Sequence, residues 1–285
     1  MKPAPFNYIA PVTIEEAAAA LKAHGYGAKL LAGGQSLIPT MNFRLAQPAV
    51  LVDINNITGL DFIRREPSGE LRIGALVRHV QLEKSPLVAA HAPLITAAMA
   101  HVAHPQIRNR GTVGGSIAHA DPAAELPAVM LALKARFRLQ NGRSSRWVAA
   151  DEFFLGLFTT ALADDELLTE IAIPPLKAGT AFAFEEVARR HGDFALSGVA
   201  VMAERGQPPR LVYINAGEIP MLARKAGQYL ANKPLTAAAM DEAAAIAQSE
   251  IEPSGDIHAT VEFKRHLAKV LTVRALTTIK EGGIA

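Results

Sequence analysis

Two glycine pairs in this chain have the neighbours expected of anion-binding loops. One is Gly33-Gly34-Gln35-Ser36, and the other is Thr112-Val113-Gly114-Gly115-Ser116. Residues without a Cβ let the backbone approach a ligand closely, and successive amides in a turn form a concave site for an anion. Either loop alone is also typical of an ordinary tight turn. Two such loops from distant parts of the chain, converging on one ligand, suit an extended diphosphate.

The motifs of the commoner nucleotide-binding folds are missing. No Gly-x-Gly-x-x-Gly opens a helix, which disfavours a Rossmann fold, and no Gly-x4-Gly-Lys-Ser/Thr indicates a P-loop. The glycine pairs therefore predict dinucleotide binding by some other fold.

The elements around the first loop predict a βαβ-like unit over residues 1–57. Thr13 and Glu16 have the spacing of a capping box, and Gly25 is a typical helix terminator. We expect a helix from the capping box to His24, strands at 28–32 and 50–54, and a short helix at 36–43. The strand at 28–32 leads directly into the first glycine pair.

Two further units follow. Residues 58–176 mix short strands with helices and predict a second, α+β unit. Within it, apolar and polar residues alternate over 136–140 and 167–173, as they do in half-buried strands. Pro174-Pro175 marks a linker because two prolines end regular structure. Residues 177–285 predict a third unit, with strands at 182–188, 198–204 and 211–216 followed by helices at 221–231, 237–249 and 259–280. The predicted class is α+β throughout.

Composition excludes several function classes. The 29 Lys and Arg residues are scattered and nearly balanced by 27 Asp and Glu, so no nucleic-acid-binding surface is indicated. The sequence has no cysteine, which excludes thiolate catalysis and cysteine-ligated metal clusters within it. No apolar run is long enough for a membrane span, and the start lacks a signal-peptide pattern, so a cytoplasmic location is expected.

At three places the sequence resembles the FAD-binding medium subunit of molybdenum hydroxylases, such as the medium chains of carbon monoxide dehydrogenase and the flavin part of xanthine dehydrogenase. The matching motifs are 31–39, 104–116 and 120–127. The resemblance extends over nearly the whole chain. It implies a two-part FAD-binding domain of the vanillyl-alcohol-oxidase/PCMH type and a C-terminal domain with a three-stranded sheet and a three-helix bundle.

The resemblance also implies which residues contact the flavin. The two loops would hold the pyrophosphate, Asp121 or Glu125 would hold a ribose or adenine-side group, and three apolar residues would line the rings. The departures from the family pattern are Gln35, Ser116 and His119. The implied cofactor-binding residues are Leu30, Leu31, Ala32, Gly33, Gly34, Gln35, Ser36, Leu37, Val102, Thr112, Val113, Gly114, Gly115, Ser116, Asp121, Glu125, Leu168 and Phe194.

Other polar residues have simpler interpretations. His101 and His104, with His91 nearby, lack the carboxylate that would complete a zinc site and fit helix ends, so no metal is predicted. Asp121 and Glu125 equally fit carboxylates at a helix start, which the helix dipole favours. An acid–base pair is a third interpretation, and no catalytic residue is predicted.

The resemblance implies an electron-transfer subunit that binds FAD without a covalent bond. Its flavin would take electrons from [2Fe-2S] clusters on a small subunit and pass them to an external acceptor, while the molybdenum cofactor sits on a large subunit, in a dimer of heterotrimers. The alternatives are a stand-alone flavin oxidase or dehydrogenase and a non-catalytic nucleotide-binding module. Gly33→Val or Gly114→Val is expected to remove FAD and spare the fold, because a Cβ would obstruct the phosphates.

Overall fold

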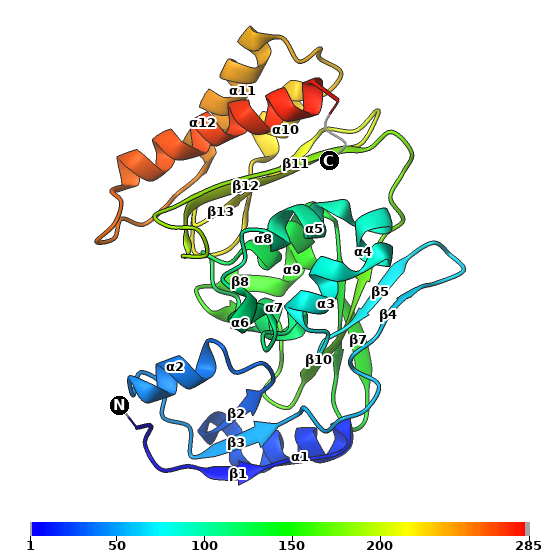
Figure 1. Cartoon of the computed structure of the whole chain (residues 1–285), viewed down its shortest axis with the longest axis vertical. Helices are drawn as coiled ribbons and strands as arrows, with labels where there is room; N and C mark the ends of the chain where they lie inside the picture. Colours follow the sequence, from blue (N-terminus) through cyan, green and yellow to red (C-terminus); the bar gives the residue numbers. More distant parts are fainter. Residues whose placement is uncertain (1, 283–285) are drawn as a thin grey trace.

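The computed structural model describes residues 2–282 as three units arranged along the long axis, each built around its own sheet (Figure 1). The first sheet is small and parallel, and the other two are antiparallel. The described residues include no helix with the length and apolar character needed to cross a membrane. The predicted mixture of helices and strands is confirmed.

The first unit has three parallel strands in the order β1-β3-β2. Thr13 caps its long helix as predicted, because its hydroxyl accepts a hydrogen bond from the amide of Glu16 at 3.1 Å. Strands β2 and β3 pair up to Leu31 opposite Asp53, so they end together at one edge of the sheet. The elements are β1 Asn7–Ile9, α1 Ile14–His24, β2 Ala28–Leu31, α2 Leu37–Asn42 and β3 Val50–Asp53.

The second unit is a five-stranded sheet in the order β4-β5-β10-β6-β7, with short helices packed on one face (Figure 1). Its strands are β4 Ile63–Arg65, β5 Leu71–Gly74, β6 Arg136–Gln140, β7 Ser145–Ala149 and β10 Leu167–Ile173, with a separate hairpin of β8 Phe154–Gly156 and β9 Thr159–Thr160. Its helices are α3 His79–Lys84, α4 Pro86–His91, α5 Pro93–Met99, α6 Pro105–Arg108, α7 Val113–His119, α8 Glu125–Ala132 and α9 Ala150–Phe153.

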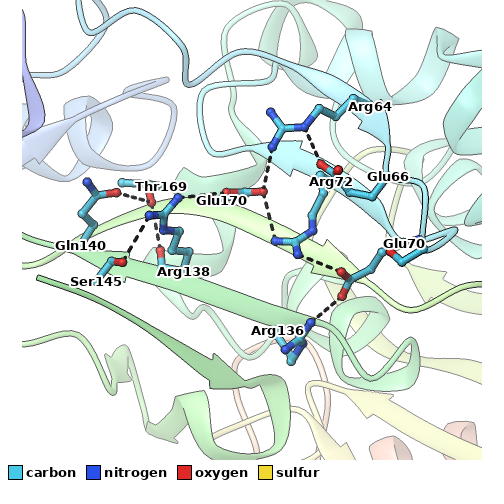
Figure 2. A network of polar contacts seen from close by, with 11 residues as sticks. Arg64, Glu66, Glu70, Arg72, Arg136, Arg138, Gln140, Ser145, Thr169 and Glu170 are labelled. Atoms are coloured by element: carbon cyan, nitrogen blue, oxygen red, sulfur yellow. Dashed lines mark hydrogen bonds and ion pairs between the residues drawn. The ribbon is translucent and has the colours of Figure 1, made fainter.

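The central strand β10 differs from the prediction of a half-buried strand, because all seven of its residues are buried. Its carboxylate Glu170 points to the face without helices and lies within 3.2–3.6 Å of the guanidinium groups of Arg64, Arg72 and Arg138 (Figure 2). Glu70 pairs in turn with Arg72 and Arg136. This ion-pair network covers the sheet face and compensates for the burial of Glu170.

The third unit has the three predicted strands and a fourth, two-residue strand that the sequence analysis missed. Because Met221 and Leu222 pair with Tyr213 and Val212, the helix predicted from residue 221 begins only at Arg224. The elements are β11 Ala181–Ala188, β12 Ala195–Ala203, β13 Arg210–Ile214, β14 Met221–Leu222, α10 Arg224–Leu230, α11 Ala237–Glu250 and α12 Val261–Lys280.

This third sheet lies between two layers of helices (Figure 1). Alternate residues of β13 explain the arrangement: Val212 and Ile214 belong to the core shared with the second unit, whereas Leu211 and Tyr213 belong to the core under α10 to α12. The sheet therefore fixes the C-terminal helices to the remainder of the molecule.

Candidate functional site

The first glycine loop joins β2 to α2 and keeps its main-chain donors free. Gly34 has φ +73°, a left-handed conformation that favours glycine. Among residues 2–282, no acceptor lies within hydrogen-bonding geometry of the five amides from Gly33 to Leu37. The side chain of Gln35 donates to the Gly33 carbonyl at 3.0 Å and braces the turn. The loop thus presents a row of unused amides, as predicted for an anion site.

The second glycine loop has a different role. It is the first turn of α7, and its amides already have acceptors in the protein: Val77 O for Val113, Ala75 O for Gly114, Thr112 Oγ1 for Gly115 and Thr112 O for Ser116. The prediction that this loop presents free amides is therefore wrong. The physical reason is its pairing with residues 75–77, which lie far away in the sequence.

The two loops nevertheless converge as predicted. A Cβ built on Gly33 would lie 2.6 Å from the carbonyl oxygen of Arg110 and 3.0 Å from the amide nitrogen of Thr112. A Cβ on Gly115 would contact the Cβ of Ala32 at 3.9 Å. The first loop therefore rests directly on the backbone that leads into α7.

These contacts also correct the expected effect of the glycine substitutions. The space at Gly33 is filled by the second loop, and a Cβ on Gly114 would lie 2.5 Å from the Cβ of Ala75. At both glycines the space that a Cβ would take is filled by protein atoms, so a phosphate does not lie there. Both glycines are required by close packing of protein backbone, so the proposed reason for Gly33→Val and Gly114→Val is wrong.

A cavity of about 310 Å³ opens beside the first loop. Five of the predicted residues line it, and six lining residues were missed by the sequence analysis. Asp53 and Asn55 could have been found, because β3 is parallel to β2 and ends beside it. The lining residues are Leu31, Ala32, Gly33, Gly34, Gln35, Ile38, Pro39, Asn42, Asp53, Asn55 and Arg110.

Asp53 and Asn55 brace the cavity wall. The Tyr8 hydroxyl donates to Asp53 at 2.6 Å, and the Asn55 side-chain amide donates to the other Asp53 oxygen and to the carbonyl of Ala32 at 2.9 Å. Burial alone would raise the pKa of Asp53, but these hydrogen bonds, together with the positive charge of Arg110, outweigh it and hold the pKa below its usual range. Asp53 is therefore ionised and already has its donors.

Arg78 joins the two loops. Its guanidinium donates to the side-chain oxygen of Asn55 at 2.6 Å and to the carbonyl of Arg110. Since Asn55 also holds Ala32, a continuous chain of hydrogen bonds runs from the first loop to the second. This chain supports the contact made at Gly33.

His79 supports the second loop from beneath. Its Nε2 lies 3.0 Å from the carbonyl oxygen of Thr112, and the ring packs against Gly111. Burial lowers the pKa of His79 to about 4, against the opposing effect of that hydrogen bond. The ring is thus neutral near neutral pH, and Nε2–H donates to Thr112.

The remaining predicted residues do not line this cavity. Val113 and Gly114 are buried in the second unit, and Val102 and Leu168 are 7% and 4% exposed in its core. Phe194, at 67% exposed, lies just before β12. Leu30 is in β2, and Ser36 and Leu37 begin α2. No cluster of three or more metal-binding side chains occurs among residues 2–282.

Two acidic side chains, one in the second unit and one in the third, lie close enough for the charge of one to affect the other. Burial raises the pKa of Glu125, at the start of α8, to about 7. Burial and the charge of Glu125 raise the pKa of Glu186, on β11, to about 8. Asp121 instead accepts a hydrogen bond from the amide of Ala123 at 2.8 Å, which fits a turn before the helix. No hydrogen bond joins the Glu125 carboxyl to the side chain of another residue among 2–282.

Comparison with known proteins identifies two protein families. The family described as "FAD binding domain in molybdopterin dehydrogenase" matches residues 4–176, and "CO dehydrogenase flavoprotein C-terminal domain" matches residues 182–279. The carbon monoxide dehydrogenase medium chain of Hydrogenophaga pseudoflava is 40% identical over 97% of both chains. A 6-hydroxypseudooxynicotine dehydrogenase complex subunit alpha of Paenarthrobacter nicotinovorans is 37% identical over 97% of this chain and 95% of that one.

Solved structures agree with this result. A chain of carbon monoxide dehydrogenase from Hydrogenophaga pseudoflava superposes with a TM-score of 0.94 at 40% identity, covering 98% of each chain. A chain of quinoline 2-oxidoreductase from Pseudomonas putida 86 superposes with a TM-score of 0.92 at 35% identity, covering all of both chains. These matches confirm the predicted order of an FAD-binding domain followed by a C-terminal domain.

The packing of the glycines generates the first prediction. Gly33→Ala forces the two loops apart and is expected to lower FAD affinity by about tenfold or more, whereas Gly114→Ala overpacks a buried site and costs about 1–3 kcal/mol of folding free energy. Flavin titration and urea unfolding of the flavin-free chain measure the two effects. Gly255→Ala is the control, since its Cβ would meet neighbours only at ordinary contact distance. Unchanged FAD affinity in Gly33→Ala would contradict the loop contact.

The second prediction concerns the buried carboxyl of Glu125. Its folded pKa of about 7 lies above its usual value of 4.5, so it favours folding at low pH, and this contribution is lost as pH rises from 4.5 through 7. Glu125→Gln keeps the side chain neutral and should stabilise the flavin-free chain by about 1–3 kcal/mol at pH about 8, with little effect at pH about 4. Glu152→Gln, at an exposed position, is the control in urea unfolding. Equal effects at both pH values would show that Glu125 is not held neutral.

Proposed function

Because the chain belongs to the family of FAD-binding subunits of molybdenum hydroxylases, we propose that it takes electrons from a partner subunit and passes them through its flavin to an external acceptor. Both family matches and relatives aligned over nearly the full length support this function. When bound, the flavin supplies the redox chemistry, and the protein supplies binding, orientation and electrostatics.

The observation that carries the proposal is the row of unused amides from Gly33 to Leu37, of which Gly33, Gly34 and Gln35 line the wall of a cavity. Amides without an acceptor, next to a left-handed glycine, fit a phosphate group better than they fit a closed turn. The arrangement fits the diphosphate of FAD, which is the ligand named by the matching family.

We assign the cofactor contacts accordingly. Leu30 to Leu37 contact the diphosphate, and the free amides from Gly33 onward donate to it. The second loop, from Thr112 to Ser116, sets the position of the first and adds the hydroxyl of Ser116. Glu125, or Asp121 beside it, accepts from ribose hydroxyls. Val102, Leu168 and Phe194 lie against the adenine or flavin rings.

The division of labour follows from composition. The sequence contains no cysteine, so thiolate-held [2Fe-2S] clusters must lie on a partner. We place these clusters on a small subunit and the molybdenum cofactor on a large one. Relatives named as medium chains, or as subunits of a dehydrogenase complex, support such partners. We propose a dimer of heterotrimers in the cytoplasm, and three domains at residues 1–57, 58–176 and 177–285.

The titratable side chains beside the two glycine loops already have protein partners. His79 is held neutral and donates to Thr112, and Asp53 is occupied by Tyr8 and Asn55. The cavity beside the first loop therefore has groups that bind and orient an anion. A stand-alone flavin oxidase is the alternative function, and it requires a small substrate that reduces the flavin directly.

Co-purification separates the two functions. Expressed with its partners, the chain is expected to elute in a complex containing flavin, iron and molybdenum, and its flavin absorption should bleach on addition of the complex's substrate. The isolated chain with FAD should show no bleaching with the same substrate. Bleaching of the isolated chain, without iron or molybdenum, would establish the alternative.

A further inference from the structure

The side chain of Arg110 is the cationic group of the cavity that lacks a protein partner. It lines the cavity together with the first glycine loop. Within the described part of the chain, its guanidinium makes no hydrogen bond and no ion pair. By comparison, the guanidinium of Arg78 beside it has acceptors in Asn55 and the Arg110 carbonyl.

The backbone of Arg110 is held in place although its side chain is free. Its carbonyl oxygen accepts from Arg78 and packs against the α-carbon of Gly33, where a Cβ would come within 2.6 Å. Its amide donates to the carbonyl of Ile107 at 3.0 Å. A fixed backbone restricts the guanidinium to the neighbourhood of the first loop, so its position follows from the contact between the loops.

The local charges leave Arg110 available for an anion. Asp53 is the acidic residue of the cavity lining, and the positive charge of Arg110 helps to lower its pKa. Its oxygens already accept from Tyr8 and Asn55, however, and no salt bridge joins it to Arg110. Burial, followed by the positive charge of Arg110, lowers the pKa of Arg78. Two guanidinium groups thus stand near one satisfied carboxylate, and the wall carries a net positive charge.

From these observations we infer that Arg110 pairs with a phosphate of the bound dinucleotide, opposite the free amides of the first loop. The inference rests on the proposed function. The main-chain amides from Val113 to Ser116 already have acceptors, so the charged contact from this side of the cavity comes from the Arg110 side chain, just before the second loop. A planar guanidinium matches phosphate oxygens in a two-point contact, which an ammonium group does not.

The test compares ligands with and without phosphates on the full-length, flavin-free chain. Arg110→Met should lower the affinities for FAD and ADP about tenfold to a hundredfold. The affinity for riboflavin should be unchanged, because riboflavin carries no phosphate. The affinity of Arg110→Lys for FAD should lie between those of Arg110→Met and the wild type. Binding is measured by quenching of flavin fluorescence and, for ADP, by calorimetry.

Two controls separate this effect from loss of structure. Arg205→Met removes a charge that is likewise exposed, from the turn after β12, and should leave the affinities for FAD, ADP and riboflavin unchanged. Urea unfolding of flavin-free Arg110→Met should match the wild type, since its side chain has no protein partner. Added salt should weaken FAD binding to the wild type more than to Arg110→Met, because ions screen charge pairs.

The outcomes distinguish the inference from the function on which it rests. If the wild type binds FAD and Arg110→Met binds it within about twofold, the inference is overturned and the proposed function stands. An equal loss of affinity for FAD and for riboflavin in Arg110→Met would also overturn the inference, since the effect would not involve phosphate. A wild type that binds no FAD would overturn the function and the inference together.

Discussion

The contact between Gly33 and the backbone of residues 110–112 is the constraint on which the site depends. It brings the end of β2, in the first unit, against the start of α7, in the second, with no side chain between them. The hydrogen bonds of Arg78 and Asn55 run alongside and hold both backbones at that separation. The unused amides of the first loop are therefore held on a rigid wall, and binding requires little ordering of the chain.

The two glycine pairs are similar in sequence but have different structural roles. Gly33 and Gly34 leave their amides free and turn the chain, whereas Gly114 and Gly115 let α7 pack against residue 75 and start beneath the cap of Thr112. A close backbone contact explains the second pair without any ligand. The site is thus asymmetric: one loop has free main-chain amides, and the other supports it, with the side chain of Arg110 just before it.

Local signals allowed much of the fold to be predicted. The cap at Thr13, the terminator at Gly25 and the strand leading into Gly33 act over a few residues, and the structure has them as predicted. The two-residue strand at Met221 pairs with the preceding strand β13 and carries too short a pattern to be predicted. Burial of Glu170 depends on a partner distant in the sequence, Arg72, and was missed. The amides of Val113 and Gly114 were misjudged for the same reason, because their acceptors lie in residues 75–77.

Residue-resolved amide hydrogen exchange, with and without FAD, tests this asymmetry directly. Exchange slows where an amide gains an acceptor, and amides that already have one exchange slowly from the start. The amides from Gly33 to Leu37 should exchange rapidly in the free chain and become protected on binding, whereas Val113 to Ser116 should be protected in both states. Protection that appears only at Val113 to Ser116, with Gly33 to Leu37 unchanged, would contradict the assignment of the first loop as the diphosphate donor.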